Sequence, residues 1–231
     1  MTKKLKKMIA IISISGLIAL TLISCEKATK ALSKNDFNKQ LKEISEYHNN
    51  TLDDFIKSTN NFEKANFRVN YDNLKNIVKK ESQNSRMSNF GDSLFMYNVD
   101  SPEDFISKYD NFTDSIKNQN NVIGNVVVEL EDVLTNFEAE DEIKTEIHKI
   151  FDKYITLADE MDKQKILVIT GTALGSVEYW NNNIQLIESN EQNQRINKLK
   201  QVMEFVLADA TCGAYGGPAG VICSGLMALS W

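Results

Sequence analysis

His48 is the histidine of this sequence whose neighbours suit proton transfer. Asp53 and Asp54 follow it closely, and Asn49-Asn50 lies between. A ring nitrogen held by a carboxylate is a common arrangement for a general base. His48 and Asp53 can approach each other if the chain bends at the asparagine pair, so these two residues form a candidate polar site. The alternatives are that His48 lies on the surface or at the edge of the core, and that the asparagines only cap or turn the chain.

Other chemistry-bearing patterns are weaker. The sequence has no HExxH, DxDxDG or GxSxG pattern and no glycine-rich phosphate-binding loop. The acidic run at 138–142 can bind Ca²⁺ weakly, but carboxylates are also favoured at a helix start by the helix dipole. Tyr179-Trp180 is either an exposed platform for carbohydrate or, as we expect, part of the core. We therefore expect no enzyme activity, no cofactor and no metal.

The first residues have the organisation of an export signal. Four lysines at positions 3, 4, 6 and 7 precede an apolar run from Met8 to Leu22. Such a run is too short for a permanent membrane helix and is typical of a secretory signal peptide. The residues that follow, Leu22-Ile23-Ser24-Cys25, resemble the lipobox of bacterial lipoproteins.

This resemblance implies a lipid anchor. In that family the cysteine becomes the first mature residue, its sulfur is diacylated and its amino group is usually acylated too, which here designates Cys25. One acyl chain binds a membrane reversibly, whereas two or more hold firmly. Glu26 differs from the Asp that often retains such proteins at the inner membrane, so the outer membrane is favoured within the cell envelope. The alternative is a plain signal peptide with an incidental Cys25.

The charge balance argues against two classes of partner. The chain carries 26 basic and 32 acidic residues, and removal of the four signal lysines leaves 22 against 32, a mature charge of −10. Binding to nucleic acid requires basic residues that neutralise phosphates, and this composition excludes it. It also excludes a broad electrostatic attachment to anionic lipid. Attachment to a membrane is therefore expected through the acyl chains, and a protein partner stays unidentified.

Two cysteines remain once Cys25 is assigned to lipid. Cys212 and Cys223 are an even remainder in an exported protein, which favours a disulfide. Closing so short a loop stabilises a fold by about 3 kcal/mol in the chain-entropy model. The alternative is a pair of buried free thiols.

The body of the chain predicts an all-α helical bundle. Prolines are confined to Pro102 and Pro218, and glycine is scarce before the end. Ser101 and Pro102 form a strong helix start. Helical spacing of apolar residues predicts helices in the following segments: 35–58 (broken in two at Asn49-Asn50), 70–82, 101–119, 121–137, 141–161, 163–180 and 191–210. The helix near residue 170 is apolar on all sides, which places it inside the bundle, and Gly171 and Gly175 share a face open to close approach.

The end of the chain, Thr211–Trp231, contains no charged side chain and holds five of the ten glycines. Gly216-Gly217-Pro218 interrupts it, so we expect a Gly-rich helical hairpin packed on the bundle. The alternatives are a membrane-active or self-associating hairpin, for which GxxxG spacing is suited, and a poorly ordered tail. The expected division is 1–24 signal peptide, 25–34 tether, 35–210 helical bundle domain and 211–231 C-terminal segment.

A second resemblance covers most of the mature chain. The stretches EYHNNTLDDFI and GSVEYW and the ADA…GA…GG ending are similar to uncharacterised lipoproteins of Bacteroidota with a Gly/Ala-rich, bacteriocin-like C-terminus. The tail departs from that pattern by its cysteines and its terminal Trp231. The resemblance implies a secreted or surface role. We expect a non-enzymatic envelope lipoprotein that acts as a structural or interaction module, the alternative being a toxin-like effector with a membrane-active C-terminal hairpin.

Overall fold

The computed structural model describes residues 34–59, 66–84, 99–136, 139–183, 195–216 and 221–230. The signal segment, Cys25 and all but the last residue of the expected tether lie outside these ranges. The chain divides into two compact units, Met1–Phe37 and Asn38–Trp231. Of the first unit only residues 34–37 are described, and they form the first turn of a helix that continues into the second.

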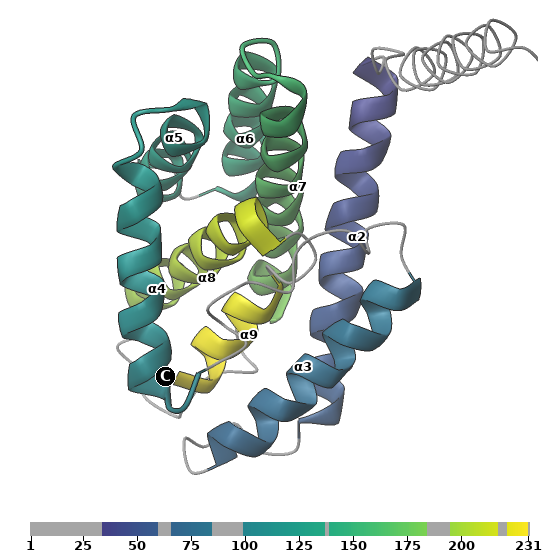
Figure 1. Ribbon diagram of the computed structural model, residues 1–231, viewed down its shortest axis with the longest axis vertical. Helices are drawn as coiled ribbons and strands as arrows, with labels where there is room; N and C mark the ends of the chain where they lie inside the picture. The colour runs from purple at the N-terminus through teal and green to yellow at the C-terminus, as the bar shows by residue number, and fades with distance from the viewer. Residues whose placement is uncertain are drawn as a thin grey trace, which may run out of the picture. The chain divides into compact units, whose positions relative to one another are not determined.

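The described residues form helices and no strand, so the predicted all-α class is confirmed. The helices, in chain order, are α2 (Lys34–Ser58), α3 (Phe67–Asn84), α4 (Pro102–Lys117), α5 (Val122–Asn136), α6 (Glu140–Tyr154), α7 (Glu160–Asn183), α8 (Arg195–Gly216) and α9 (Val221–Ser230). Figure 1 shows α5, α6 and α7 running side by side, with α8 crossing them. Within the second unit α7 packs against α6 and α8, and α9 packs against α3, α4 and α8.

Helix α7 is the core helix of the bundle, as its sequence predicts. All twelve residues from Ile166 to Val177 are buried. Trp180 is fully buried, and its ring lies 4.7 Å from that of Phe205 on α8. Tyr179 is also buried. The aromatic pair is therefore part of the core, as expected, and not an exposed platform.

Two glycines on one face of α7 let α2 approach its backbone. A Cβ atom on Gly171 would lie 2.9 Å from Cγ2 of Ile44, and one on Gly175 would lie 2.9 Å from the backbone oxygen of Ser45. Both distances are shorter than carbon atoms tolerate. The close approach expected on this face is confirmed, and α2 is the helix that uses it.

The expected break at Asn49-Asn50 is wrong, because α2 is one continuous helix. Asparagine lowers helix propensity by only a fraction of a kcal/mol, about 0.7 or less relative to alanine. Burial of Leu41, Ile44, Leu52 and Phe55 on the same helix outweighs that cost. The hydroxyl of Thr51 donates to the carbonyl of Tyr47 one turn earlier, so even this polar stretch stays hydrogen-bonded along the helix.

Helix α4 begins as its sequence predicts. Ser101 is the N-cap, its hydroxyl accepts the backbone N–H of Asp104 at 3.1 Å, and Pro102 is the first helical residue. Asp104 also accepts hydrogen bonds from the backbone N–H of Asp100 and from Lys108. These bonds fix the direction in which α4 leaves residues 99–101.

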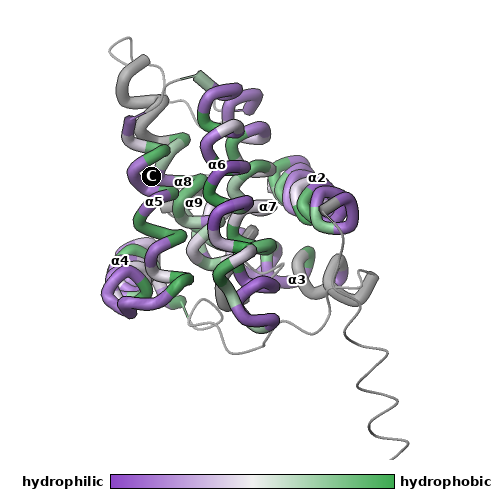
Figure 2. Tube along the Cα trace, turned by 90° about the horizontal axis from the view of Figure 1, so that it is seen from above, coloured by the Kyte–Doolittle hydropathy of each residue, from purple (hydrophilic) through white to green (hydrophobic). Residues whose placement is uncertain are grey.

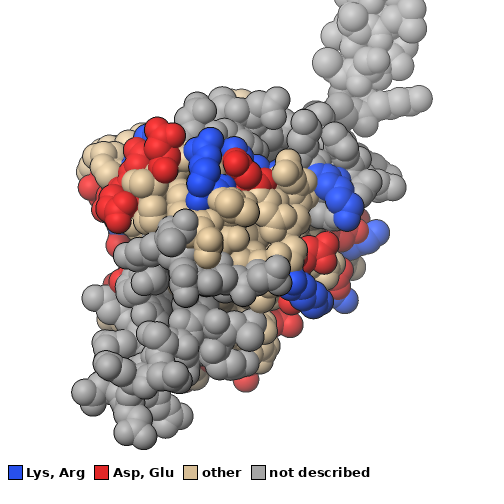
Figure 3. Space-filling model, turned by 90° about the horizontal axis from the view of Figure 1, so that it is seen from below, with Lys and Arg blue, Asp and Glu red and all other residues tan. Residues whose placement is uncertain are grey.

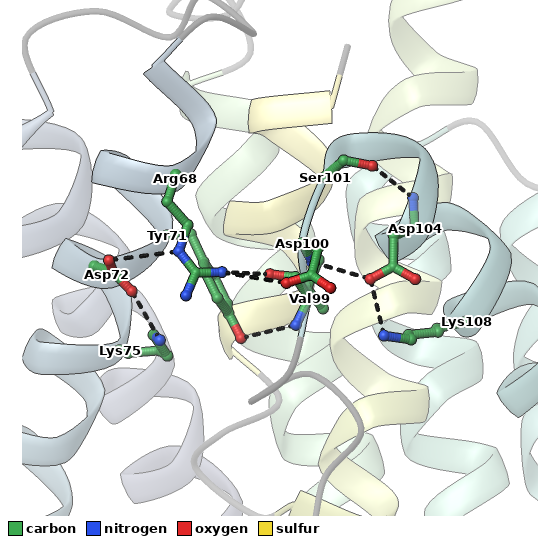
Figure 4. A network of polar contacts seen from close by, with 9 residues as sticks. All are labelled: Arg68, Tyr71, Asp72, Lys75, Val99, Asp100, Ser101, Asp104 and Lys108. Atoms are coloured by element: carbon green, nitrogen blue, oxygen red, sulfur yellow. Dashed lines mark hydrogen bonds and ion pairs between the residues drawn. The ribbon is translucent and has the colours of Figure 1, made fainter.

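Helix α3 also contacts residues 99–101, as Figure 4 shows. The Arg68 guanidinium donates to the carbonyl of Val99 at 3.0 Å, and the backbone N–H of Val99 donates to the buried Tyr71 phenol at 3.3 Å. The ammonium of Lys75 lies 4.2 Å from the centre of the Tyr71 ring, a cation–π contact. These contacts link α3 to the start of α4, and α4 carries much of the site described below.

Helices α5 and α6 are amphipathic, and Figure 2 shows polar and apolar residues alternating along them. The valine run of α5 is helical, as the apolar spacing over 121–137 predicts. The Tyr154 hydroxyl of α6 donates to Glu129 of α5 at 2.7 Å, and Lys153 pairs with the same carboxylate. Burial raises the pKa of Glu129, but the Lys153 and Tyr154 hydrogen bonds outweigh it and leave that pKa below its usual value.

Charged side chains are interspersed on the face shown in Figure 3. Lysine and arginine lie among aspartate, glutamate and uncharged residues over the described part of that face. Many exposed pairs follow helical spacing, for example Lys39–Glu43 and Lys42–Glu46. Such pairs contribute about 0.3–0.5 kcal/mol each. They keep the helices soluble more than they determine the fold.

Candidate functional site

His48 lies in the core, and its partner comes from the far end of the sequence. Its Nε2 donates to Oδ2 of Asp209 at 2.8 Å, across a sequence separation of 161 residues. Its Nδ1 lies 2.9 Å from the side-chain oxygen of Asn49. His48 is 1% exposed and Asp209 is 0% exposed. The pair is therefore enclosed by protein.

Two further groups donate hydrogen bonds to this carboxylate. The Ser176 hydroxyl donates to Oδ2 of Asp209 at 2.6 Å, and the backbone N–H of Ser224 donates to Oδ1 at 2.8 Å. The four groups come from α2, α7, α8 and α9. We call His48, Ser176, Asp209 and Ser224 the Asp209 cluster. It joins four helices at one buried carboxylate.

The geometry of the Asp209 cluster differs from that of a hydrolase. In a nucleophilic triad the imidazole accepts the hydroxyl proton of the serine. Here the Ser176 hydroxyl and the His48 imidazole both donate to the same carboxylate oxygen. Every member is buried. The arrangement satisfies a buried charge with hydrogen bonds, which is what such a charge requires for stability.

Asp53 is placed away from His48. Its carboxylate pairs with Lys57 at 2.7 Å, one turn along α2, and its side chain is 46% exposed. Burial raises the pKa of the Tyr179 phenol, and the nearby Asp53 carboxylate raises it further. On a continuous helix, residues five apart point about 140° away from each other. The two candidate residues are therefore not brought together, because the bend that would have joined them does not occur.

His148 is exposed on α6. The acidic run ends in the first turn of α6, as the helix-dipole interpretation expects, although residues 137 and 138 lie outside the described part of the chain. Within the ranges that the structure covers, no group of three or more His, Cys, Asp or Glu side chains is placed to hold a metal ion.

Cys212 and Cys223 form a disulfide, as predicted. It joins α8 to α9 with a Cα–Cα distance of 6.4 Å, and both cysteines are 0% exposed. Helix α8 runs through to Gly216, so the uncharged segment begins inside a helix. Residues 217–220 between the two helices lie outside the described residues. None of the helices in the ranges described is both long enough and apolar enough to span a membrane.

A cavity of about 640 Å³ lies among four helices. Its walls come from α4, α5, α8 and α9, and these helices contact one another in a closed ring: α4 with α5, α5 with α8, α8 with α9, and α9 with α4. Ile106, Leu207 and Met227 provide apolar lining. This volume falls within the usual range for small-molecule sites, roughly 300–1,000 Å³.

The polar lining of the cavity is predominantly acidic. Its carboxylates belong to Asp110, Asp114, Glu131 and Glu204, and its ammonium belongs to Lys117. Lys117 is engaged, because its Nζ lies 2.6 Å from Glu131. The lining therefore carries an excess of negative charge.

Two hydroxyl groups also face the cavity. The Thr113 side chain is 4% exposed, and its hydroxyl lies close enough to the Tyr109 phenol to lower the pKa of that phenol. The Tyr109 side chain is 6% exposed. Burial raises the pKa of the Tyr109 phenol far above its usual value, and the neighbouring hydroxyls of Thr113 and Thr211 oppose that shift only in part. The phenol therefore stays protonated and neutral at physiological pH.

Comparison with known proteins gives no family for this chain: no family model, no curated protein and no solved structure matches it.

Sequence reasoning identified one member of the Asp209 cluster and missed the others. Asp209 stands in VLADATCG, an isolated acidic residue within a largely apolar stretch. Burial of such a residue requires a partner, which is a signal that could have found it. Its pairing with His48 could not be found, because the distance along the chain gives no indication of contact. The cavity could not be predicted either, because it forms only where four helices pack together.

Proposed function

We propose that this protein is a non-enzymatic lipoprotein of the bacterial cell envelope, attached to a membrane by acyl chains on Cys25 and acting as a structural or interaction module. The observation that carries this proposal is the burial of the uncharged C-terminal sequence. Residues 211–213 of α8 and 223–227 of α9 are buried. A segment that completes the core is not free to enter a bilayer while the fold is intact.

The disulfide supports export. Disulfides are stable in periplasmic and extracellular surroundings and rare in the reducing cytosol. Cys212 and Cys223 pair with each other, which leaves Cys25 for the lipid. We further propose that the end of α8 from Thr211 onward and α9 belong to the Gly-rich helical hairpin expected from the sequence for Thr211–Trp231, packed on α3, α4 and α7.

The enclosure of the Asp209 cluster supports a non-enzymatic role. His48 is the histidine for which the sequence suggests proton transfer. Both His48 and Asp209 are buried away from solvent. A substrate would have to open the contact between α2 and α7 to reach them. The hydrogen bonds to the Asp209 carboxylate join α8 to α2, α7 and α9.

The lipid anchor is tested by metabolic labelling with an alkynyl fatty acid. Wild-type protein is expected to carry the label and to enter the detergent phase of a detergent partition. Cys25→Ser is expected to lose both properties, whereas the double variant Cys212→Ser/Cys223→Ser keeps the label. An unlabelled wild-type protein would refute the anchor.

The toxin-like alternative has its own specific support in the sequence, since α9 (VICSGLMALS) carries no charge. It requires α9 to leave the core, and the disulfide to α8 limits that movement. Liposomes loaded with a self-quenching dye are expected to stay intact with the oxidised protein, and also after reduction of the disulfide. Dye release by the reduced protein, suppressed when Leu226 is changed to Asp, would favour the toxin-like effector.

A further inference from the structure

The turn between α6 and α7 carries exposed apolar side chains. Leu157 lies in this turn and Met161 lies in the first turn of α7, and they are 65% and 70% exposed. We infer that this end of the second compact unit faces the bilayer and that Leu157 and Met161 enter the lipid headgroup region. The inference rests on the acyl chains proposed for Cys25, because it concerns how the anchored protein is oriented.

Leu157 and Met161 differ from other exposed apolar residues because they lie together. Val69 on α3 and Val128 on α5 are also exposed, but each is on a separate helix. Leu157 and Met161 are four residues apart, on either side of Asp159, whose carboxylate caps the start of α7. A single exposed apolar residue is ordinary, whereas two at one turn form a small patch.

Helix α2 enters the second unit from the same end. A Cβ atom on Gly171 of α7 would lie 3.3 Å from the backbone oxygen of Leu41. One on Gly175 would lie 2.9 Å from the backbone oxygen of Ser45. Because the residue numbers rise together, α2 and α7 run parallel. Asn38, the first residue of the second unit, is therefore displaced from Leu41 towards the start of α7.

The proposed anchor is close in sequence to this point of entry. Cys25 is 13 residues before Asn38. That many residues span at most about 45 Å, even when fully extended. Acyl chains on Cys25 would thus keep the second unit beside the bilayer, where a weak contact with lipid forms readily because the local concentration is high. The end at which α2 enters meets the bilayer without the chain having to double back.

The charges beside the patch are nearly balanced. Glu160 pairs with Lys163 at 2.6 Å, and Asp162 pairs with Lys165 at 3.3 Å. Opposite charges this close largely cancel at a distance. The acidic excess of the mature chain therefore does not prevent this end from touching a zwitterionic lipid surface.

The neighbouring turn at this end is polar but uncharged. Glu129, midway along α5, accepts a hydrogen bond from Tyr154, the last residue of α6. Since α5 and α6 run antiparallel, the first half of α5 extends past Tyr154 towards the α6–α7 turn. The α4–α5 turn, residues 118–121, reads Asn-Gln-Asn-Asn and is exposed. Figure 1 shows both turns at the upper end of the bundle. Amide side chains can hydrogen-bond to headgroup oxygens without adding charge.

Site-specific fluorescence tests the orientation. The intact lipidated chain is bound to phosphatidylcholine vesicles, with an environment-sensitive dye on Asn120→Cys or, as a control, on Asp141→Cys. Both positions are exposed, and Asp141 lies at the opposite end of α6, about 20 Å from the last residue of that helix. The dye reacts with the new thiol, because Cys25 is acylated and Cys212 is paired with Cys223.

A nitroxide on the lipid, close to the headgroup, quenches dyes that lie near it. We expect the dye at Asn120 to be quenched about twofold more than the dye at Asp141, since an interfacial contact brings one end of the protein to the boundary between headgroups and acyl chains.

Paired variants test the patch itself. Leu157→Asp/Met161→Asp is expected to remove the extra quenching at Asn120, because an ionised carboxylate is costly to bring into lipid. The matched control Val69→Asp/Val128→Asp places the same charges at other exposed apolar positions and is expected to leave the quenching unchanged. Circular dichroism verifies that each variant is folded.

Vesicle flotation separates this inference from the lipid anchor. A chain that does not float with the vesicles overturns the anchor and the orientation together. A chain that floats but is quenched equally at Asn120 and Asp141 overturns the orientation alone. Equal effects of the two double variants overturn the contact assigned to Leu157 and Met161. A signal at Asn120 that varies with protein concentration in detergent, before vesicles are added, would identify a second copy of the chain as the occupant of the patch.

Discussion

A single carboxylate receives hydrogen bonds from three other helices in this protein. Asp209 on α8 accepts from His48, Ser176 and the backbone of Ser224, all out of contact with solvent. At the residue scale, loss of this carboxylate is costly, because each donor would be left buried without its acceptor.

Asp209→Ala is therefore expected to lower the free energy of unfolding by about 3–5 kcal/mol, the usual cost of removing one partner from a buried pair. Urea denaturation followed by circular dichroism measures it. The control Asp54→Asn is exposed on α2 and should change stability by less than about 0.5 kcal/mol. Equal effects of the two variants would contradict a structural role for the Asp209 cluster.

The buried Tyr109 phenol is expected to make the protein less stable at alkaline pH. Burial raises the pKa of its phenol above the usual 10.0. Below pH 10 the phenol is protonated in both states and contributes no pH dependence. Above pH 10 the unfolded state releases the proton and the folded state keeps it, so the free energy of unfolding falls by up to about 1.4 kcal/mol per pH unit.

Tyr109→Phe removes this contribution. Urea denaturation at pH 9, 10 and 11 should show a shallower decline for the variant than for wild type. Lysines that titrate in the same range are common to both proteins and cancel in the comparison. Parallel declines would show that the phenol ionises as readily in the folded protein as in the unfolded chain.

At the scale of the helices, the predictable parts were those with a strong local signal. The start of α4 follows from Ser101 and Pro102, and the central place of α7 follows from its uninterrupted apolar sequence. Local patterns failed where tertiary contacts decide. The asparagine pair suggested a break, yet packing of α2 on α7 holds the helix straight through it.

Gly175→Ala tests that packing. An added methyl group would meet the backbone of Ser45 at 2.9 Å, and backbone atoms cannot turn away. We expect a loss of about 1–3 kcal/mol, the usual cost of overpacking. Gly213→Ala is the matched control on α8: its nearest neighbours are side-chain atoms at 3.3 Å, and alanine favours a helix by about 1 kcal/mol over glycine. Thermal unfolding ranks the two, and a greater loss in Gly213→Ala would contradict the close approach of α2 to α7.

At the scale of the whole molecule, the disulfide joins the last two helices described. Cys212→Ala/Cys223→Ala is expected to lower the free energy of unfolding by about 3 kcal/mol, because an 11-residue separation gives a short loop whose closure restricts the unfolded chain. Urea denaturation of wild type with and without reductant gives the same comparison without substitution. Mass spectrometry under non-reducing conditions verifies the bond, and two free thiols in the native protein would refute it.

The whole-molecule view also explains which parts of the candidate site escaped prediction. The disulfide could be predicted, because the number of cysteines and the expected compartment are read from the sequence alone. The cavity could not be predicted, because its wall combines Lys117, Glu131, Glu204 and Met227 from four helices. Their proximity is a result of packing, and no local pattern encodes it.

The pairing of His48 with Asp209 also restricts the positions in which α2 can dock. Sliding that helix along its partner by one turn, about 5.4 Å, would carry the imidazole away from the carboxylate and set different side chains against the notch made by Gly171 and Gly175. A compact but misaligned chain thus holds an uncompensated negative charge in its interior. Misaligned intermediates should be short-lived, and the correct alignment is selected by electrostatics as well as by shape.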